Sequence, residues 1–170
     1  MNEFREIKPE AITDNVIKLI GKDWMLITAG TLTQFNPMTA SWGGMGNLWN
    51  GPVTFAFVRP QRYTFPLMEA GTYYTLSFFD EAYRKALNFC GTKSGRDVDK
   101  VAATGLTPVE GATGAVYFAE ARLVLECRKL YSQDLKEENF VAPELIDKHY
   151  AARDFHKMYI GEIVYCLIRR

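Results

Sequence analysis

Residues 24–58 read WMLITAGTLTQFNPMTASWGGMGNLWNGPVTFAFV, a run of 35 residues that contains no Asp, Glu, Lys or Arg. Apolar and β-branched segments alternate in this run with clusters of turn-forming residues, which is the pattern of successive strands. We predict strands over residues 24–31, 38–42 and 53–58, with a turn at residues 34–37. The run holds five glycines and two prolines and no unbroken apolar segment of about 18 residues, so it does not predict a membrane span.

The segments outside this run predict more strands and a few helices. Strands are expected over residues 72–79, 116–130 and 158–168, the last with a bulge at Gly161. Helices are expected over residues 14–20, 80–89, 97–104 and 143–150. Their expected N-caps are Asp14, Asp80 and Asp97, and the expected helix ends are Gly21, Gly91 and Gly105. Because strands predominate without a regular β-α-β alternation, we predict a mainly β fold with helical decorations rather than a doubly wound sheet. One domain is expected over residues 1–170.

Composition excludes several classes of function. Twenty basic residues balance twenty acidic ones, and the formal net charge is therefore zero. A general nucleic-acid or anionic-membrane binder would show a basic excess, so we expect neither partner. The N-terminus has no apolar signal segment, and the three cysteines, odd in number, have no metal-site spacing. We therefore expect a cytoplasmic protein with reduced cysteines.

Common catalytic motifs are absent from the sequence. Gly43, Gly44 and Gly46 do not complete a dinucleotide-binding G-x-G-x-x-G, and no phosphate loop of the G-x-x-x-x-G-K-[ST] kind occurs. The two histidines, His149 and His156, form no H-E-x-x-H. We expect no metal site and no side chain that acts as catalytic acid, base or nucleophile.

The side chains and glycines best suited to bind a ligand lie in residues 35–44 and 58–64. Small hydroxyl residues and glycines in the first segment let backbone amides approach a flat ligand, and Thr39 and Ser41 add hydrogen-bonding groups. Arg59 and Arg62 in the second segment can present planar guanidinium groups to a phosphate. The alternative is that the first segment is only a tight strand and turn, and that the arginines form surface ion pairs.

Three motifs in chain order resemble the flavin reductase-like, flavoredoxin-type family. They are Asn36-x-Met38-Thr-Ala-Ser-Trp-Gly, Val58-Arg-Pro-x-Arg-Tyr-Thr64 and Gly91-Thr-Lys-Ser-Gly-Arg-Asp-x-Asp-Lys100. The tail His156-x-x-Tyr-Ile-Gly-Glu-Ile163 is also typical of this family, so the resemblance covers almost the whole chain. It implies an FMN-binding split barrel, which is a Greek-key antiparallel β-barrel, and a homodimer with FMN near the subunit interface.

The resemblance also implies which residues surround FMN. The isoalloxazine ring would be lined by Asn36, Met38, Thr39, Ala40, Ser41 and Trp42. The ribityl phosphate would be held by Arg59, Arg62 and Thr64, and the positive rim would be extended by Lys93, Ser94 and Lys100. His156 would lie close to the ring.

Structural alternatives to these assignments remain open in the sequence. Arg62 and Lys100 would then pair with neighbouring acids, and Ser94 would be a turn or helix-cap residue. His156 would be a structural histidine at the end of a strand.

The resemblance implies an FMN-binding oxidoreductase, in the first place an NAD(P)H-dependent flavin reductase that passes hydride from nicotinamide to flavin N5. NADH or NADPH would be its transient co-substrate, and its electron acceptor has no motif in the sequence. One alternative is a flavoredoxin-like FMN electron carrier between proteins. A second is a split-barrel binding protein without enzymatic activity, since a fold alone does not determine a function.

Overall fold

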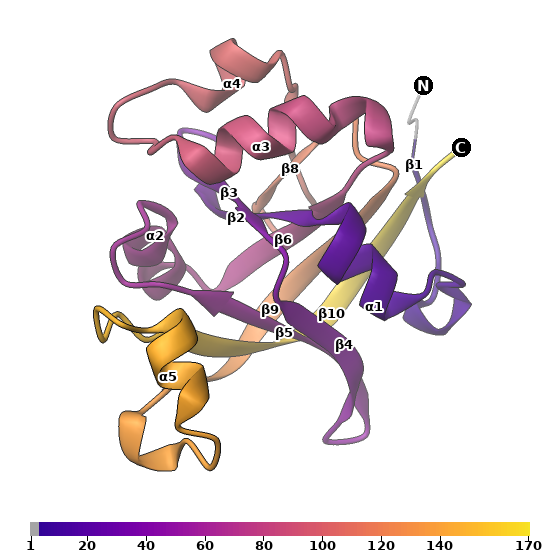
Figure 1. Cartoon of the computed structure of the whole chain (residues 1–170). Helices are drawn as coiled ribbons and strands as arrows, with labels where there is room; N and C mark the ends of the chain where they lie inside the picture. Colours follow the sequence, from indigo (N-terminus) through magenta and orange to yellow (C-terminus); the bar gives the residue numbers. More distant parts are fainter. Residues whose placement is uncertain (1–3) are drawn as a thin grey trace.

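The computed structural model describes residues 4–170, and most of its strands belong to one antiparallel sheet (Figure 1). These strands are β1 (Phe4–Glu6), β2 (Met25–Thr31), β3 (Gln34–Ala40), β4 (Gly43–Leu48), β5 (Gly51–Val58), β6 (Tyr73–Phe78), β9 (Leu123–Asp134) and β10 (Lys157–Arg169). Their order is β3-β2-β6-β9-β10-β5-β4, and β1 pairs with the end of β10. A separate hairpin is formed by β7 (Pro108–Glu110) and β8 (Val116–Phe118). Residues 1–3 of the predicted single domain lie outside the described residues.

Short helices decorate the sheet, as predicted. They are η1 (Pro9–Ala11), α1 (Val16–Lys18), the π turn η2 (Leu19–Asp23), α2 (Thr64–Ala70), η3 (Glu81–Tyr83), α3 (Arg84–Thr92), α4 (Lys100–Thr104), η4 (Glu137–Asn139) and α5 (Glu144–His149). In Figure 1, α3 and α4 lie together on one side of the sheet, and α5 lies at the other end of the molecule. Within residues 4–170, none of the helices has the length and apolar character needed to cross a membrane.

The predicted turn at residues 34–37 is wrong, because these residues form the first half of β3. The chain reverses before it, between Thr31 and Gln34, which pair with each other across β2 and β3. Pro37 is accommodated because β3 is the last strand of the sheet, and an edge strand directs part of its N–H groups away from the ladder.

Strand β4 was not predicted, since its glycine-rich sequence has low β propensity. It becomes a strand because the turn at Trp49 and Asn50, both with positive φ (52° and 61°), folds it back onto β5. The single strand predicted over residues 116–130 is divided, because a turn at residues 119–122 separates β8 from β9. Each part then pairs with a different partner, β8 with β7 and β9 with β6 and β10.

Two helix caps differ from the prediction by one or two residues. Asn15, and not Asp14, caps α1 by accepting a hydrogen bond from the backbone of Lys18. Asp99, and not Asp97, caps α4, where it accepts from two backbone N–H groups. Each pair consists of neighbouring residues with similar capping propensity, so sequence alone does not separate them.

Glycine ends only some of the helices for which it was predicted as the end. Gly105 ends α4 with φ +70°, as predicted, because glycine adopts the left-handed region without strain. Gly21 and Gly91 were predicted as ends, but the helical turns continue past them to Asp23 and Thr92. Helix α2 was not predicted at all, and its Pro66 lies in the first turn, where no helical N–H bond is lost.

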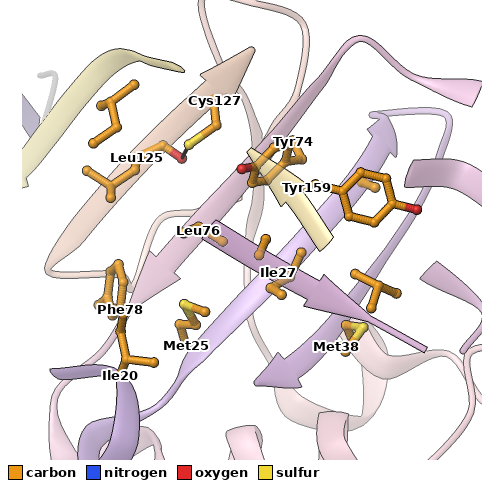
Figure 2. Close-up of a cluster of buried hydrophobic side chains, with 14 of the residues drawn as sticks. Ile20, Met25, Ile27, Met38, Tyr74, Leu76, Phe78, Leu125, Cys127 and Tyr159 are labelled. Carbon is orange, nitrogen blue, oxygen red and sulfur yellow. Dashed lines mark hydrogen bonds between the residues drawn. The ribbon is translucent and has the colours of Figure 1, made fainter. Parts of the chain in front are cut away.

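The main core is built from alternate residues of neighbouring strands (Figure 2). Met25 and Ile27 of β2 and Leu76 and Phe78 of β6 are fully buried on one face of the sheet. Tyr74 joins them, and its hydroxyl hydrogen bonds to Thr54 at 2.7 Å. A Cβ atom on Gly161 would lie 2.4 Å from this hydroxyl, so the glycine makes room for Tyr74. The predicted bulge is confirmed, because the β9–β10 register shifts between Ile160 and Gly161.

Thr28 and Thr75 face each other across β2 and β6, and both are fully buried. Thr75 Oγ1 donates to the carbonyl of Val116 at 2.5 Å, whereas Thr28 Oγ1 has no hydrogen-bond partner among the described residues. An unpaired buried hydroxyl costs about 1–3 kcal/mol. We therefore expect Thr28→Val to raise the free energy of unfolding by about 1 kcal/mol, and Thr75→Val to lower it by a similar amount. Urea unfolding of both variants measures this, and equal effects would contradict it.

Candidate functional site

A cavity of about 450 Å³ lies between β3, the end of β5 and the loop that follows α3. Its volume falls in the range of small-molecule and cofactor sites. All thirteen predicted site residues line it, although they come from separate parts of the chain: Asn36, Met38, Thr39, Ala40, Ser41, Trp42, Arg59, Arg62, Thr64, Lys93, Ser94, Lys100 and His156. The lining also includes Phe57, Gln61, Tyr63, Thr92 and Gly95, and none of the lining residues in the described part of the chain is Asp or Glu.

The β3 wall is tied to the helices by its polar side chains. Asn36 is 4% exposed, and its Nδ2 donates to Thr64 Oγ1 at 2.7 Å and to the carbonyl of Pro37 at 3.2 Å. Thr39 Oγ1 donates to the carbonyl of Leu87 in α3. The hydroxyls of Thr39 and Thr64 therefore fix the shape of the cavity, in addition to lining it.

Gly95 brings the loop after α3 into direct contact with this wall. A Cβ atom at Gly95 would lie 2.0 Å from Asn36 Oδ1 and 2.8 Å from the Tyr63 ring. The next residue, Arg96, places its guanidinium over the Tyr63 ring and donates to the carbonyl of Gln61. Glycine is the one residue that fits at position 95 without a shift of the loop or of Asn36.

Three cations form one side of the cavity. Arg62 Nη1 donates to the carbonyl of Gly91 at 3.0 Å, and Lys100 Nζ donates to the carbonyls of Pro37 and Cys90, both at 2.8 Å. Cys90 and Gly91 lie in the last turn of α3, where free carbonyls and the helix dipole favour positive charge. Lys93 is exposed at the end of the same helix.

Within residues 4–170, no carboxylate forms an ion pair with Arg62, Lys93 or Lys100. The alternative in which Arg62 and Lys100 pair with neighbouring acids is therefore wrong. Lys100 is only 6% exposed, and its burial, together with the nearby charge of Arg62, lowers the pKa of its ammonium group. Because a buried charge without a counter-ion is costly, this side of the cavity is suited to an anion.

Aromatic rings form another side. The Trp42 ring lies 5.1 Å from His156, the Phe57 ring lies 6.5 Å from His156, and Trp42 is 42% exposed. His156 is buried just before β10, and its Nδ1 hydrogen bonds to the hydroxyl of Tyr150 at 2.8 Å. His156 is thus a structural histidine beside a strand end, and it also lines the cavity.

Arg59 lies on the aromatic side of the cavity, beside Tyr150. Its Nη1 donates to Asp154 at 2.5 Å and its Nη2 to the carbonyl of His149 at 2.9 Å. Its guanidinium also stands 5.2 Å from the Tyr150 ring. Arg59 is therefore the cavity arginine with a carboxylate partner.

The remaining lining residues had weak signals in the sequence. Gln61, Tyr63, Thr92 and Gly95 stand inside the quoted motifs but carry no charge that suggested a role. Phe57 lies near the end of β5, two residues before Arg59, and both residues line the cavity. Ser94 is also a turn residue, since its Oγ accepts from the backbone of Arg96 at 3.2 Å.

Burial, with Arg59 and Arg62 nearby, lowers the pKa of His156 to about 4, although Asp154 acts in the opposite direction. The folded protein then resists protonation between about pH 6.5 and pH 4, where the unfolded chain takes up the proton. Stability contributed by neutral His156 is present above pH 6.5 and is lost as the pH falls through this window. We expect wild type to lose up to about 3 kcal/mol more than His156→Gln between these pH values.

Urea unfolding at a series of pH values measures this difference, with His149→Gln as the control for the loss of a histidine. If wild type and His156→Gln lose the same free energy of unfolding over the window, the lowered pKa of His156 is contradicted.

Comparisons with known proteins bear on the family and the fold of the chain. The family model described as "flavin reductase like domain" matches residues 18–170. A flavoredoxin from Methanosarcina acetivorans has a TM-score of 0.65 at 22% identity, with 94% of this chain and 72% of that chain covered. The FMN-binding domain of a flavin reductase-like enzyme from Shewanella baltica OS155 has a TM-score of 0.70 at 15% identity, with 99% and 78% covered.

A third solved structure is the NADH:FAD oxidoreductase from Streptomyces globisporus C-1027, with a TM-score of 0.65 at 18% identity and coverage of 86% and 80%. No curated protein matches the chain. Identities this low bear on the fold, and they confirm the predicted split barrel.

Proposed function

The chain belongs to the flavin reductase-like family, and on that premise we propose that it is an FMN-binding oxidoreductase that reduces flavin with NADH or NADPH. The observation that carries this proposal is the composition of the cavity. One side holds Arg62, Lys93 and Lys100 without carboxylate partners among residues 4–170, and another side holds the Trp42, Phe57 and His156 rings.

The lining fits FMN by the chemistry of its groups. A phosphate dianion needs several cationic and hydroxyl donors to replace its water, and the cavity offers Lys100, Arg62, Lys93 and the hydroxyls of Thr92 and Ser94. A flat heteroaromatic ring needs an uncharged wall, and residues 36–42 come from the run without charges. Among residues 4–170, no Asp or Glu lines the cavity, so the lining does not repel the phosphate.

The bound cofactor would supply the redox chemistry, which is acceptance of hydride from reduced nicotinamide and onward transfer of electrons. The chain supplies binding and orientation. Arg62, Lys93 and Lys100 would balance the phosphate charge, and the uncharged residues 38–42 would contact the ring. Trp42 and Phe57 would shield that side of the ring from water, and neutral His156 adds no charge there at pH 7.

The visible spectrum of purified protein with FMN tests this proposal. After excess FMN is removed, the protein is expected to keep a flavin absorption band. That band should bleach when NADH or NADPH is added without oxygen. Sustained oxidation of the coenzyme with free flavin present is then expected under air.

Two other results would support the alternative functions. A flavin band that neither coenzyme bleaches, but that a reduced protein partner does, favours the alternative of a flavoredoxin-like FMN electron carrier. If the protein retains no flavin, the result supports the other alternative, a split-barrel binding protein without enzymatic activity.

We further propose that the protein is a cytoplasmic homodimer. Strand β4 is an edge of the sheet without charged residues, and Trp49 at its turn is 60% exposed. An uncharged, exposed edge strand favours pairing with another chain. Sedimentation equilibrium should give twice the monomer mass, and Trp49→Lys should weaken the association. A monomer at every concentration would contradict the proposal.

A further inference from the structure

The segment between β9 and β10, residues 135–156, leaves and rejoins the sheet at paired neighbours. Asp134 at the end of β9 is paired with Lys157 at the start of β10. We call this segment, which contains η4 and α5, the strap; Figure 1 shows α5 at the outer end of the sheet, far from α3. An internal aromatic cluster holds the strap together, since Phe140, Tyr150 and Phe155 lie 4.9–5.8 Å apart.

Few groups hold the strap against the rest of the protein. In the described part of the chain, its side-chain hydrogen bonds to residues outside it all come from Arg59 and Gln61. Both terminal nitrogens of Arg59 are used, one on Asp154 and one on His149, and these residues flank Tyr150, over which the guanidinium lies. Arg59 therefore holds the strap through three contacts, with Asp154, with the carbonyl of His149 and with the Tyr150 ring.

The strap in turn supports the aromatic wall of the cavity. The Trp42 ring lies 5.2 Å from His149, 6.5 Å from Tyr150 and 5.1 Å from His156, all of which belong to the strap. His156 is itself held by Tyr150 through its Nδ1. A strap that moved away from the sheet would therefore displace both Trp42 and His156.

We infer that Arg59 is a positioning residue that anchors the strap, and that it acts on flavin binding through Trp42 and His156 rather than by binding the phosphate. This inference rests on the proposed flavin-binding function. Arg59 already has a carboxylate partner, and a phosphate placed on it would stand beside the negative charge of Asp154. Arg62, Lys93 and Lys100 carry no such neighbour among the described residues and remain for the phosphate.

The test compares FMN with riboflavin, which lacks the phosphate, by fluorescence titration of wild type, Arg59→Met and Asp154→Asn. Both variants should weaken the binding of both flavins by the same factor, about 5-fold or more, the scale of coupling between linked sites. Arg128→Met is the matched control, because Arg128 also pairs with a carboxylate, Glu162, but on the sheet surface outside the cavity. It should leave both affinities unchanged.

A second measurement needs no flavin. Trypsin can cut the strap after Lys136, Lys148 and Arg153. We expect the cuts after Lys148 and Arg153, which lie beside the residues bound by Arg59, to be faster in Arg59→Met and Asp154→Asn than in wild type or Arg128→Met. Unchanged cleavage in both variants would overturn the anchoring role.

The inference is also overturned if Arg59→Met weakens FMN binding alone while Asp154→Asn strengthens it, since that pair of results identifies Arg59 as a phosphate ligand. If wild type binds neither flavin, the proposed function fails and the role of Arg59 in flavin binding falls with it. The cleavage rates still decide separately whether Arg59 anchors the strap.

Discussion

Replacing Arg62 by alanine is expected to weaken FMN binding by about 10- to 150-fold, which corresponds to the loss of a charged hydrogen bond worth about 1.5–3 kcal/mol. Arg62 lines the cavity and donates one hydrogen bond from Nη1 to the carbonyl of Gly91. It has no carboxylate partner among residues 4–170. Its remaining donors are therefore available to an anion. Fluorescence titration with FMN measures the affinity.

Riboflavin separates loss of the phosphate contact from general damage to the cavity. Arg62→Ala should bind riboflavin as wild type does, because riboflavin has no phosphate to lose. Arg84→Ala is the matched control, since Arg84 stacks on Trp24 outside the cavity, and it should change neither affinity. If Arg62→Ala weakens riboflavin as much as FMN, the assignment of Arg62 to the phosphate is wrong.

The fold was predictable wherever apolar or β-branched residues dominate a segment. Strands β2, β5, β6 and β10 carry buried apolar or β-branched residues, and each was predicted close to its observed bounds. Strand β4 was missed because tertiary contacts form it against its local propensity, and helix α2 was missed because it is short and contains Pro66. Glycine-rich β4 exists through its pairing with β5, and the start of α2 is fixed by the bond between Thr64 and Asn36.

The residues that line the cavity were more predictable than the ion pairs and packing contacts that they make. Charge and motif place Arg59, Arg62 and Lys100 at one site, and all three line it. Sequence does not reveal which of them has an acidic partner, because Asp154 is 95 residues away from Arg59 and meets it only through the strap. Gly95 was likewise unassigned, since the reason for a glycine there is the position of Asn36 in a distant strand.

The substitution Gly95→Ala is expected to damage the site through this close contact. Its Cβ would stand 2.0 Å from Asn36 Oδ1, so that either the loop moves or Asn36 turns and loses its hydrogen bond to Thr64. Overpacking of this kind costs about 1–3 kcal/mol of unfolding free energy. FMN affinity should fall by about tenfold or more, because the loop carries Lys93 and Ser94. Urea unfolding and FMN titration measure the two effects.

A double-mutant cycle assigns this cost to Asn36. Asn36→Ala alone should destabilise the protein, since Thr64 loses a partner, but in that background Gly95→Ala meets no Oδ1 atom. The double variant should therefore be more stable than the sum of the two single effects predicts, by about 1 kcal/mol or more. Gly21→Ala is the matched control, because a Cβ there meets nothing within 4 Å, its φ is not positive, and it lies outside both the cavity and β4. Strict additivity of Gly95→Ala and Asn36→Ala would mean that the loop, and not Asn36, yields to the added methyl group.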